Sequence, residues 1–264
     1  MFKKIIFAVA FATLALGQAA KAQTNLQVFY DFGKDRNIIT STLEGFHMDK
    51  WGNTFFFVDY DYNLKNSAPN GTYFEIARCF NFWQDTPLGG LSLQAEYNGG
   101  RYNLYGINNA WLAGLDYFLH SSDFKNTLNI KVLYKWIDYA KVDDLERHPS
   151  TQLDLTTPLK SNVPLQFTLV WGMQDLFGVK GLRFSGFADF WWQDHYLYSD
   201  NKGEDMAPEL SHVVFISEPQ LWYNVGQFFG CENLNIGGEV ELSYDFGSAK
   251  GFWVRPCAGV KWVF

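Results

Sequence analysis

The chain has 264 residues and a formal net charge of −7, and 47% of its residues are hydrophobic and 19% aromatic. A chain this acidic is poorly suited to the phosphate backbone of nucleic acids, which excludes a nucleic-acid partner. Its three cysteines and five histidines have neither the spacing of a disulfide framework nor that of a metal site. We therefore expect no metal and no cofactor.

Residues 1–22 have the pattern of a cleaved secretory signal. Two lysines precede an apolar run over residues 5–16, which is too short to cross a bilayer as a helix. Residues 20–22, Ala-Lys-Ala, form a small-residue cleavage site, so we expect the mature chain to begin at Gln23. An uncleaved N-terminal anchor is the alternative.

Residues 23–264 alternate between apolar and polar side chains in about twelve segments, which turn-rich stretches separate. Their length is that of tilted membrane-spanning strands, and no linker divides them, so we expect one β-barrel domain over 23–264. The predicted strands cover residues 25–32, 38–47, 53–62, 72–81, 90–98, 109–120, 127–139, 163–173, 182–193, 212–225, 234–246 and 251–264.

Alternation gives each predicted strand an apolar outer face and a polar inner face. In segment 234–246, for example, Ile236, Tyr244 and Phe246 are expected to face out, and Glu239 and Glu241 to face in. Polar inner faces imply a hydrated lumen, because a buried charge without water or a partner is very costly. The aromatic outer faces suit lipid better than the solvent around a soluble sandwich.

The last predicted strand ends the chain on an aromatic residue. Ala258, Val260, Trp262 and Phe264 share its apolar face. This pattern is typical of the closing strand of a bacterial outer-membrane β-barrel, and the outer-membrane assembly machinery reads such a C-terminal Phe264. The predicted partners are therefore the lipid bilayer of the outer membrane and that machinery. A strand of a soluble sandwich is the alternative.

An even number of strands places both ends of the barrel in the periplasm and the longer connections outside. The longest connections, near 140–162 and 194–211, fall on the outer side and are rich in polar residues. Two residues fit the pattern less well. Arg78 falls on the lipid face near the periplasmic end, where it can snorkel, and Pro219 predicts a bulge or kink within a strand.

Several segments together resemble the Tsx-like family of nucleoside-specific channel-forming outer-membrane porins. The resemblance is carried by residues 41–62 (STLEGFHMDKWGNTFFFVDYDY), 73–80 (YFEIARCF), 128–141 (LNIKVLYKWIDYAK), 165–194 (LQFTLVWGMQDLFGVKGLRFSGFADFWWQD) and 259–264 (GVKWVF). It implies an all-β, monomeric, twelve-stranded up-and-down barrel that passes nucleosides by diffusion. Segment 217–226 (SEPQLWYNVG) departs from the family pattern, which bears on nucleoside specificity more than on the fold.

A nucleoside offers a flat base that stacks on aromatic rings and a sugar that hydrogen-bonds to polar groups. Arg183, Phe187, Asp189 and Trp191 share one face in a row and form the leading candidate group. Because inward acids exceed inward bases, we expect anionic solutes to pass less readily than neutral or cationic ones. The full set of predicted lumen residues is Phe55, Phe57, Asp59, Asp61, Glu75, Lys131, Arg183, Phe187, Asp189, Trp191, Glu218 and Gln220.

Two other functions compete with a channel. An outer-membrane lipase needs a serine and a histidine that can pair, but the neighbours Ser211 and His212 point to opposite faces of a strand. We therefore expect no enzyme. A closed barrel with a structural, adhesive or receptor role is the stronger alternative, because a barrel this small is close to the size that side chains fill.

Overall fold

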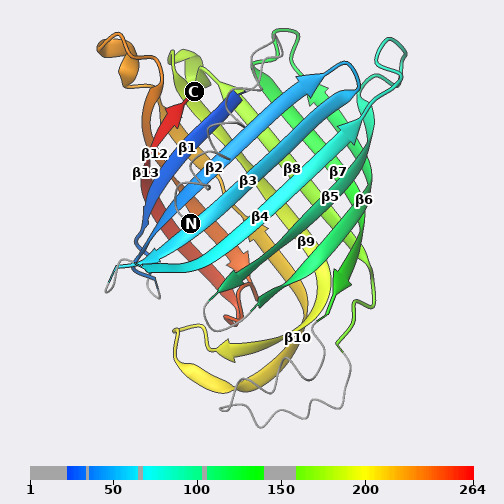
Figure 1. The fold of residues 1–264 in the computed structure, drawn as a ribbon, viewed down its shortest axis with the longest axis vertical. Helices are drawn as coiled ribbons and strands as arrows, with labels where there is room; N and C mark the ends of the chain where they lie inside the picture. The colour runs from blue at the N-terminus through cyan, green and yellow to red at the C-terminus, as the bar shows by residue number, and fades with distance from the viewer. Residues whose placement is uncertain (1–22, 34–35, 65–67, 103–105, 140–158) are drawn as a thin grey trace, which may run out of the picture.

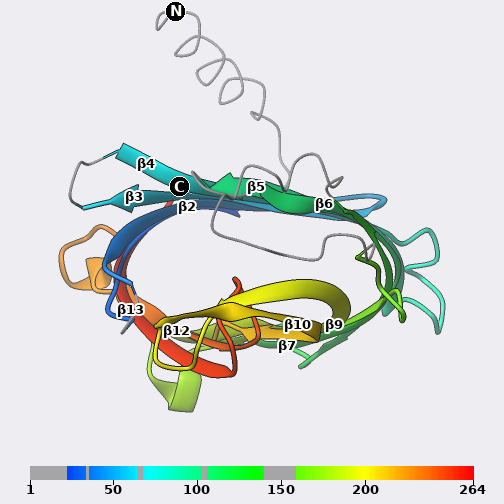
Figure 2. The same ribbon diagram turned by 90° about the horizontal axis from the view of Figure 1, so that it is seen from below.

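The computed structural model describes residues 23–33, 36–64, 68–102, 106–139 and 159–264. These residues form a closed antiparallel β-barrel with an oval cross-section (Figures 1 and 2). Each strand pairs with the next, and the first strand closes the sheet against the last. The predicted fold class is confirmed. The predicted signal segment 1–22 lies outside the described residues.

The described residues contain thirteen strands and two short 3-10 turns. They are β1 (Gln23–Asp31), β2 (Ile38–Asp49), β3 (Gly52–Asn63), β4 (Ala68–Phe80), β5 (Leu91–Tyr102), β6 (Gly106–His120), β7 (Asn126–Asp138), β8 (Leu165–Gln174), η1 (Leu176–Gly178), β9 (Leu182–Ser199), β10 (Asp205–Ser217), β11 (Gln220–Tyr223), η2 (Gly226–Phe228), β12 (Leu234–Tyr244) and β13 (Phe252–Val263).

The wall of the barrel has twelve positions because β10 and β11 share one of them. Both strands pair with β9 on one side and with β12 on the other. The break between them falls at Glu218 and Pro219, where proline has no N–H to give to the ladder. The Glu218 N–H instead reaches the Phe187 carbonyl, and the Pro219 carbonyl accepts from the Val240 N–H. The kink predicted at Pro219 is confirmed.

Inward and outward side chains alternate as predicted along most of the wall. In β7, Leu133 is completely buried, whereas Val132 and Tyr134 beside it are exposed. In β13, Val260 and Trp262 are exposed, whereas Lys261 is buried. The outside of the barrel is thus an apolar and aromatic band of the kind that faces lipid in membrane barrels.

Two details of the predicted pattern are wrong at the rim that carries the connection between β7 and β8. Segment 194–211 is not a loop, because β9 continues to Ser199 and pairs with β10. A register shift between Ser211 and Val213 interrupts the alternation there and hides the strand from a period-2 analysis. Phe246 turns inward, because β12 ends at Tyr244 and Asp245 has the left-handed φ of 50°.

The start of β1 and the end of β13 lie at the same rim, here called the terminal rim. The opposite rim carries the β9–β10 hairpin, which extends beyond the wall and curves over part of the opening (Figures 1 and 2). Arg78 reaches the terminal rim, where its guanidinium pairs with Asp49 at 2.9 Å. No helix among the described residues is long and apolar enough to cross a membrane.

The apolar outward band predicts that a charged side chain introduced into it strongly destabilises the protein. Val132→Arg would place an unpaired guanidinium in the middle of the band, and we expect it to lower the free energy of unfolding in lipid vesicles by about 2–4 kcal/mol. Ser122→Arg, in the exposed turn between β6 and β7, is the matched control and should be nearly neutral. Equal effects in urea titrations would show that the band does not face hydrocarbon.

Candidate functional site

The candidate site is the lumen, and the strand register places the predicted lumen residues on the inward face of the wall. Most of them are half-buried, whereas their inward neighbours Gln27, Ser243 and Trp222 are almost completely buried. Space for solvent therefore remains beside the predicted residues but not along the whole lumen. The half-buried residues are Phe55, Phe57, Asp59, Glu75, Lys131, Arg183, Phe187, Asp189, Glu218 and Gln220; Asp61 and Trp191 are buried.

Neutral donors on the same strand or on a neighbouring strand hold most of the inward carboxylates. On the β2–β3 wall, the Thr42 hydroxyl donates to Asp59 at 2.5 Å, and the Thr40 hydroxyl donates to Asp61 at 2.6 Å. Hydroxyl and amide donors stabilise a carboxylate without cancelling its charge. The same arrangement recurs as Asn25 on Glu44, Gln94 and Asn98 on Glu96, Asn129 on Asp116, Thr168 on Asp189, and Gln220 on Glu239.

One inward acid is instead neutralised by two bases. Glu241 receives the Arg255 guanidinium at 2.5 Å and the Arg36 guanidinium at 2.8 Å, and the Ser243 hydroxyl donates to it as well. Arg36 also lies 3.4 Å from Asp31. This group is buried near the rim opposite the termini and ties β1, β12 and β13 together.

Several of the inward acids also lie close to one another. Glu218 interacts electrostatically with Glu239 on the neighbouring strand β12 and with Asp59 on the more distant strand β3. Glu75 is in range of Glu96 and Asp189. Lys131 and Lys135 offset part of this second group. The lumen is therefore acidic as a whole. Its inward acids are Asp31, Glu44, Asp59, Asp61, Glu75, Glu96, Asp116, Asp189, Glu218, Glu239 and Glu241, and its inward bases are Arg36, Lys131, Lys135, Arg183, Arg255 and Lys261.

A strip of three aromatic rings lines the β3–β4 wall between these acids. The ring centroids of Phe55 and Phe57 are 5.9 Å apart, and those of Phe57 and Tyr73 are 5.6 Å apart. Glu75 and Asp59 flank the strip at the next inward positions of the same strands. Flat apolar faces and hydrogen-bond acceptors thus lie side by side on one wall.

An apolar cluster occupies the lumen toward the rim opposite the termini. It consists of Ala110, Leu112, Leu133, Ile137, Trp191, Val214 and Ile216, with Tyr139, Phe187 and Phe246 packed against it. The Lys135 ammonium lies 3.9 Å from the centre of the Trp191 ring and also donates to Gln166 at 2.7 Å. This part of the lumen is filled by its own side chains.

The β9–β10 hairpin is fastened to the turn between β12 and β13 beside this cluster. The Ser211 hydroxyl donates to the Asp245 carboxylate at 2.7 Å, and His195 Nε2 lies 2.6 Å from the Asp245 carbonyl. The Lys250 N–H donates to the Ser199 carbonyl. These contacts keep the hairpin folded over the opening.

The leading candidate group from the sequence, Arg183, Phe187, Asp189 and Trp191, does not form one site. Arg183 lies opposite Trp222 near the terminal rim, whereas Trp191 belongs to the apolar cluster. Asp189 between them is held by the Thr168 hydroxyl. These residues do share the inward face of β9, but they take part in different contacts.

Sequence reasoning missed several residues that shape the lumen. Tyr73 shares the inward face of its strand with Glu75, and Arg255 shares that of its strand with Lys261, so alternation alone was a sufficient signal for both. Arg36 and Phe246 were beyond that signal, because they come from connections rather than strands.

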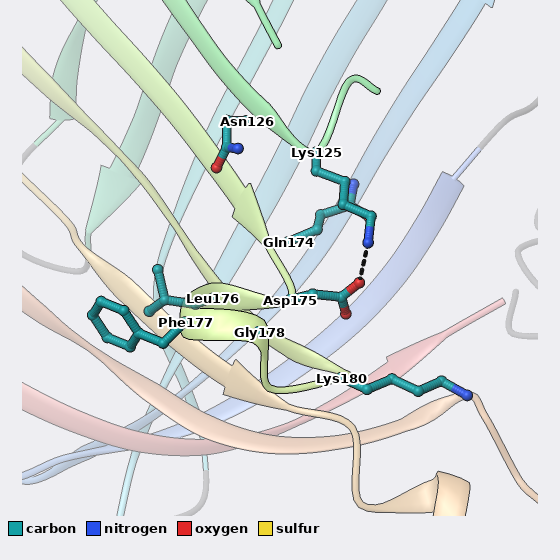
Figure 3. A pocket seen from close by; sticks show the side chains of 8 residues that line it. All are labelled: Lys125, Asn126, Gln174, Asp175, Leu176, Phe177, Gly178 and Lys180. Carbon is teal, nitrogen blue, oxygen red and sulfur yellow. Dashed lines mark hydrogen bonds and ion pairs between the residues drawn. The ribbon is translucent and has the colours of Figure 1, made fainter. Parts of the chain in front are cut away.

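A pocket lies at the terminal rim, outside the lumen, between the start of β7 and the β8–β9 turn (Figure 3). The Lys125 ammonium pairs with Asp175 at 2.6 Å and holds the pKa of that carboxyl below its ordinary value. Leu176 and Phe177 point away from this ion pair (Figure 3). Within the described part of the chain, no group of three or more His, Cys, Asp or Glu side chains is arranged to hold a metal.

The family model described as "Domain of unknown function (DUF5020)" matches residues 22–264. The chain belongs to this family. No curated protein matches the sequence. Among solved structures, the NanC porin is 10% identical with a TM-score of 0.52, and the match covers 90% of this chain and 98% of that one. At this identity the likeness is one of fold, and it agrees with the barrel described above.

Two further solved structures match over most of their length with lower scores. The KdgM porin in complex with disordered oligogalacturonate is 11% identical, with a TM-score of 0.45 and coverage of 92% of this chain and 99% of that one. OccK2 (OpdF) of Pseudomonas aeruginosa in complex with glucuronate is 10% identical, with a TM-score of 0.42 and coverage of 93% and 98%.

The buried ion pairs around Glu241 predict that breaking a buried pair lowers the free energy of unfolding more than breaking an exposed pair does. Arg255→Ala removes one of two bases from a buried carboxylate, and we expect the free energy of unfolding to fall by about 3 kcal/mol. Lys250→Ala, which breaks the exposed pair with Glu209, should cost less than about 1 kcal/mol. The double change Arg255→Met with Glu241→Leu should recover much of the loss in denaturant titrations, and no recovery would contradict the pairing.

Proposed function

We propose that this protein is an outer-membrane channel through which small solutes diffuse passively, and that its lumen favours cationic and neutral solutes. The observation that carries the proposal is the way the inward acids are held. Hydroxyl and amide donors stabilise them without neutralising them, so their negative field persists inside the lumen. The apolar outer band and the outer-membrane porin fold support a place in that membrane, with Phe264 as the contact for the assembly machinery.

Nucleosides are the solutes that we propose first. The strip of Phe55, Phe57 and Tyr73 offers faces on which a base stacks, and Asp59 and Glu75 beside it accept hydrogen bonds from ribose hydroxyls. Nucleosides carry no charge at neutral pH, so an acidic lumen does not exclude them.

A closed barrel with a structural or receptor role is the second candidate. It is favoured by the apolar cluster in the lumen and by the hairpin fastened over the opening. The two candidates differ in whether the purified, folded barrel conducts ions in planar bilayers.

The acidic lumen predicts cation selectivity. Under a salt gradient, we expect the reversal potential to show a preference for potassium over chloride, and Glu44→Gln combined with Asp61→Asn should reduce that preference. Asp200→Asn, in the exposed turn between β9 and β10, is the control and should leave the reversal potential unchanged. Anion preference in the wild-type protein would overturn the proposal.

The aromatic strip predicts that nucleosides block the ionic current. Phe57→Ala removes one stacking face, and we expect the apparent affinity of the block to fall about tenfold. Phe56→Ala changes the neighbouring ring, which faces outward, and should leave the block unchanged. Equal effects of the two variants would reject the strip as a nucleoside site while leaving the channel proposal intact.

The apolar cluster predicts that a smaller side chain widens the passage at a cost in stability. Trp191→Ala should raise the single-channel conductance and lower the free energy of unfolding by about 3–5 kcal/mol. The closed-barrel candidate would be favoured if neither the wild-type barrel nor this variant conducts, provided that both migrate as folded barrels on unheated gels.

A further inference from the structure

The connections at the terminal rim expose large apolar side chains, unlike the polar turn 200–204 at the other rim. Phe177 in the β8–β9 turn is 91% exposed, and Phe228 and Phe229 in the β11–β12 turn are 66% and 79% exposed. In the β4–β5 connection, Phe82 and Leu88 are also exposed. Exposed aromatic residues this numerous are costly in water and indicate an interaction surface.

The exposure of Phe177 is built into the backbone. Asp175 and Phe177 both have left-handed φ values, of 52° and 54°, which are uncommon for residues other than glycine. The Asp175 carboxylate fixes this turn by accepting the Gly181 N–H at 2.9 Å and by pairing with Lys125. The turn thus holds Phe177 away from the barrel rather than allowing it to fold back.

These turns project outward from the wall, toward the side on which the apolar band lies. Figures 1 and 2 show η1, η2 and the β4–β5 connection outside the outline of the barrel. Ring contacts join two of the three turns to the band: the ring centroid of Phe82 lies 6.0 Å from that of the outward Phe80, and the ring centroid of Phe228 lies 6.1 Å from that of the outward Tyr223. The exposed turn residues therefore continue the surface that faces lipid.

We propose that these three turns insert into the interface of the membrane leaflet on the terminal side, with lipid as the partner of Phe82, Leu88, Phe177, Phe228 and Phe229. The inference rests on the proposed place in the outer membrane, where this leaflet is the periplasmic one. Interfacial insertion covers the apolar rings, and the Lys125–Asp175 pair remains at the level of the headgroups. The turns then fix the depth of the barrel in the bilayer.

Phe124 is a matched control on the same rim. It is 56% exposed and also has a left-handed φ, of 57°. Its ring stacks on His120, which stacks on Phe118, and both lie on the inward face of β6. Phe124 therefore sits on the lumen side of the rim and does not join the lipid-facing band.

Hydroxyl-radical footprinting of the wild-type protein in lipid nanodiscs tests the proposal without any substitution. In the protein alone, Phe177 and Phe229 are more exposed than Phe124, so in water they would be oxidised at least as fast. In nanodiscs we expect the order to reverse, with Phe124 oxidised several-fold faster. An unreversed order would overturn insertion into lipid and make a periplasmic protein the candidate partner.

Phe167 is an outward residue of β8 within the band. Its oxidation rate shows whether a negative result contradicts only this inference or also the proposed place in the membrane. If Phe167 is oxidised as fast as Phe124, the barrel is not embedded, and the proposal of an outer-membrane channel fails. If Phe167 is protected while Phe177 and Phe229 are not, only the inference about the turns fails.

As a second measurement, Phe177→Ser with Phe229→Ser should slow refolding into vesicles, whereas Phe124→Ser should not; equal rates would contradict the proposal.

Discussion

Closure of the sheet is the constraint on which the rest of this structure depends. Hydrocarbon offers no hydrogen-bond partner to a backbone N–H or carbonyl, so a membrane-spanning sheet must have no free edge. Here β1 pairs with β13 from Asn25 opposite Val263 to Asp31 opposite Cys257. Once the ladder is closed, every second side chain must face lipid and every other one the lumen. The chain meets this demand with an apolar face and a polar face on nearly every strand.

The oval section of the barrel makes the lumen crowded, and that crowding decides how its charges are held. Inward side chains meet across the lumen: the ring centre of Phe29 on β1 lies 5.5 Å from that of Trp222 on β11, although β12 and β13 separate these two strands in the wall. Acids in so narrow a space would repel one another strongly if they lacked donors. Thr42, Thr168 and Gln220 supply those donors locally, strand by strand. In the channel that we propose, the negative potential therefore remains available to attract cations, because ion pairs do not cancel it.

The sequence predicted the wall of this barrel closely and the interior only in part. Period-2 alternation located the strands and even the break at Pro219, because facing and the missing N–H are local properties of a strand. Alternation could not predict that Trp191 packs in an apolar cluster. That depends on which residues of other strands, such as Ile137 and Val214, lie beside it in the folded barrel. Nor could it predict that Arg36 or Phe246 enters the lumen, because connections have no period. The hairpin over the opening was missed for a related reason: the register shift between Ser211 and Val213 breaks the very alternation that reveals a strand.

The position of the apolar cluster follows from the shortness of β8. This strand begins only at Leu165, whereas β7 and β9 extend farther toward the same rim. Before its start, residues 159–164 take its place irregularly. The Asp194 N–H donates to the Lys160 carbonyl, the Lys160 N–H donates to the Asp194 carboxylate, and the Ser161 hydroxyl donates to the Trp192 carbonyl. A wall with so few ladder bonds needs packing from inside, and Trp191 and Ile137 with their neighbours supply it. The same side chains that support the weak part of the wall therefore narrow the passage, so a change that widens the lumen here must also weaken the barrel.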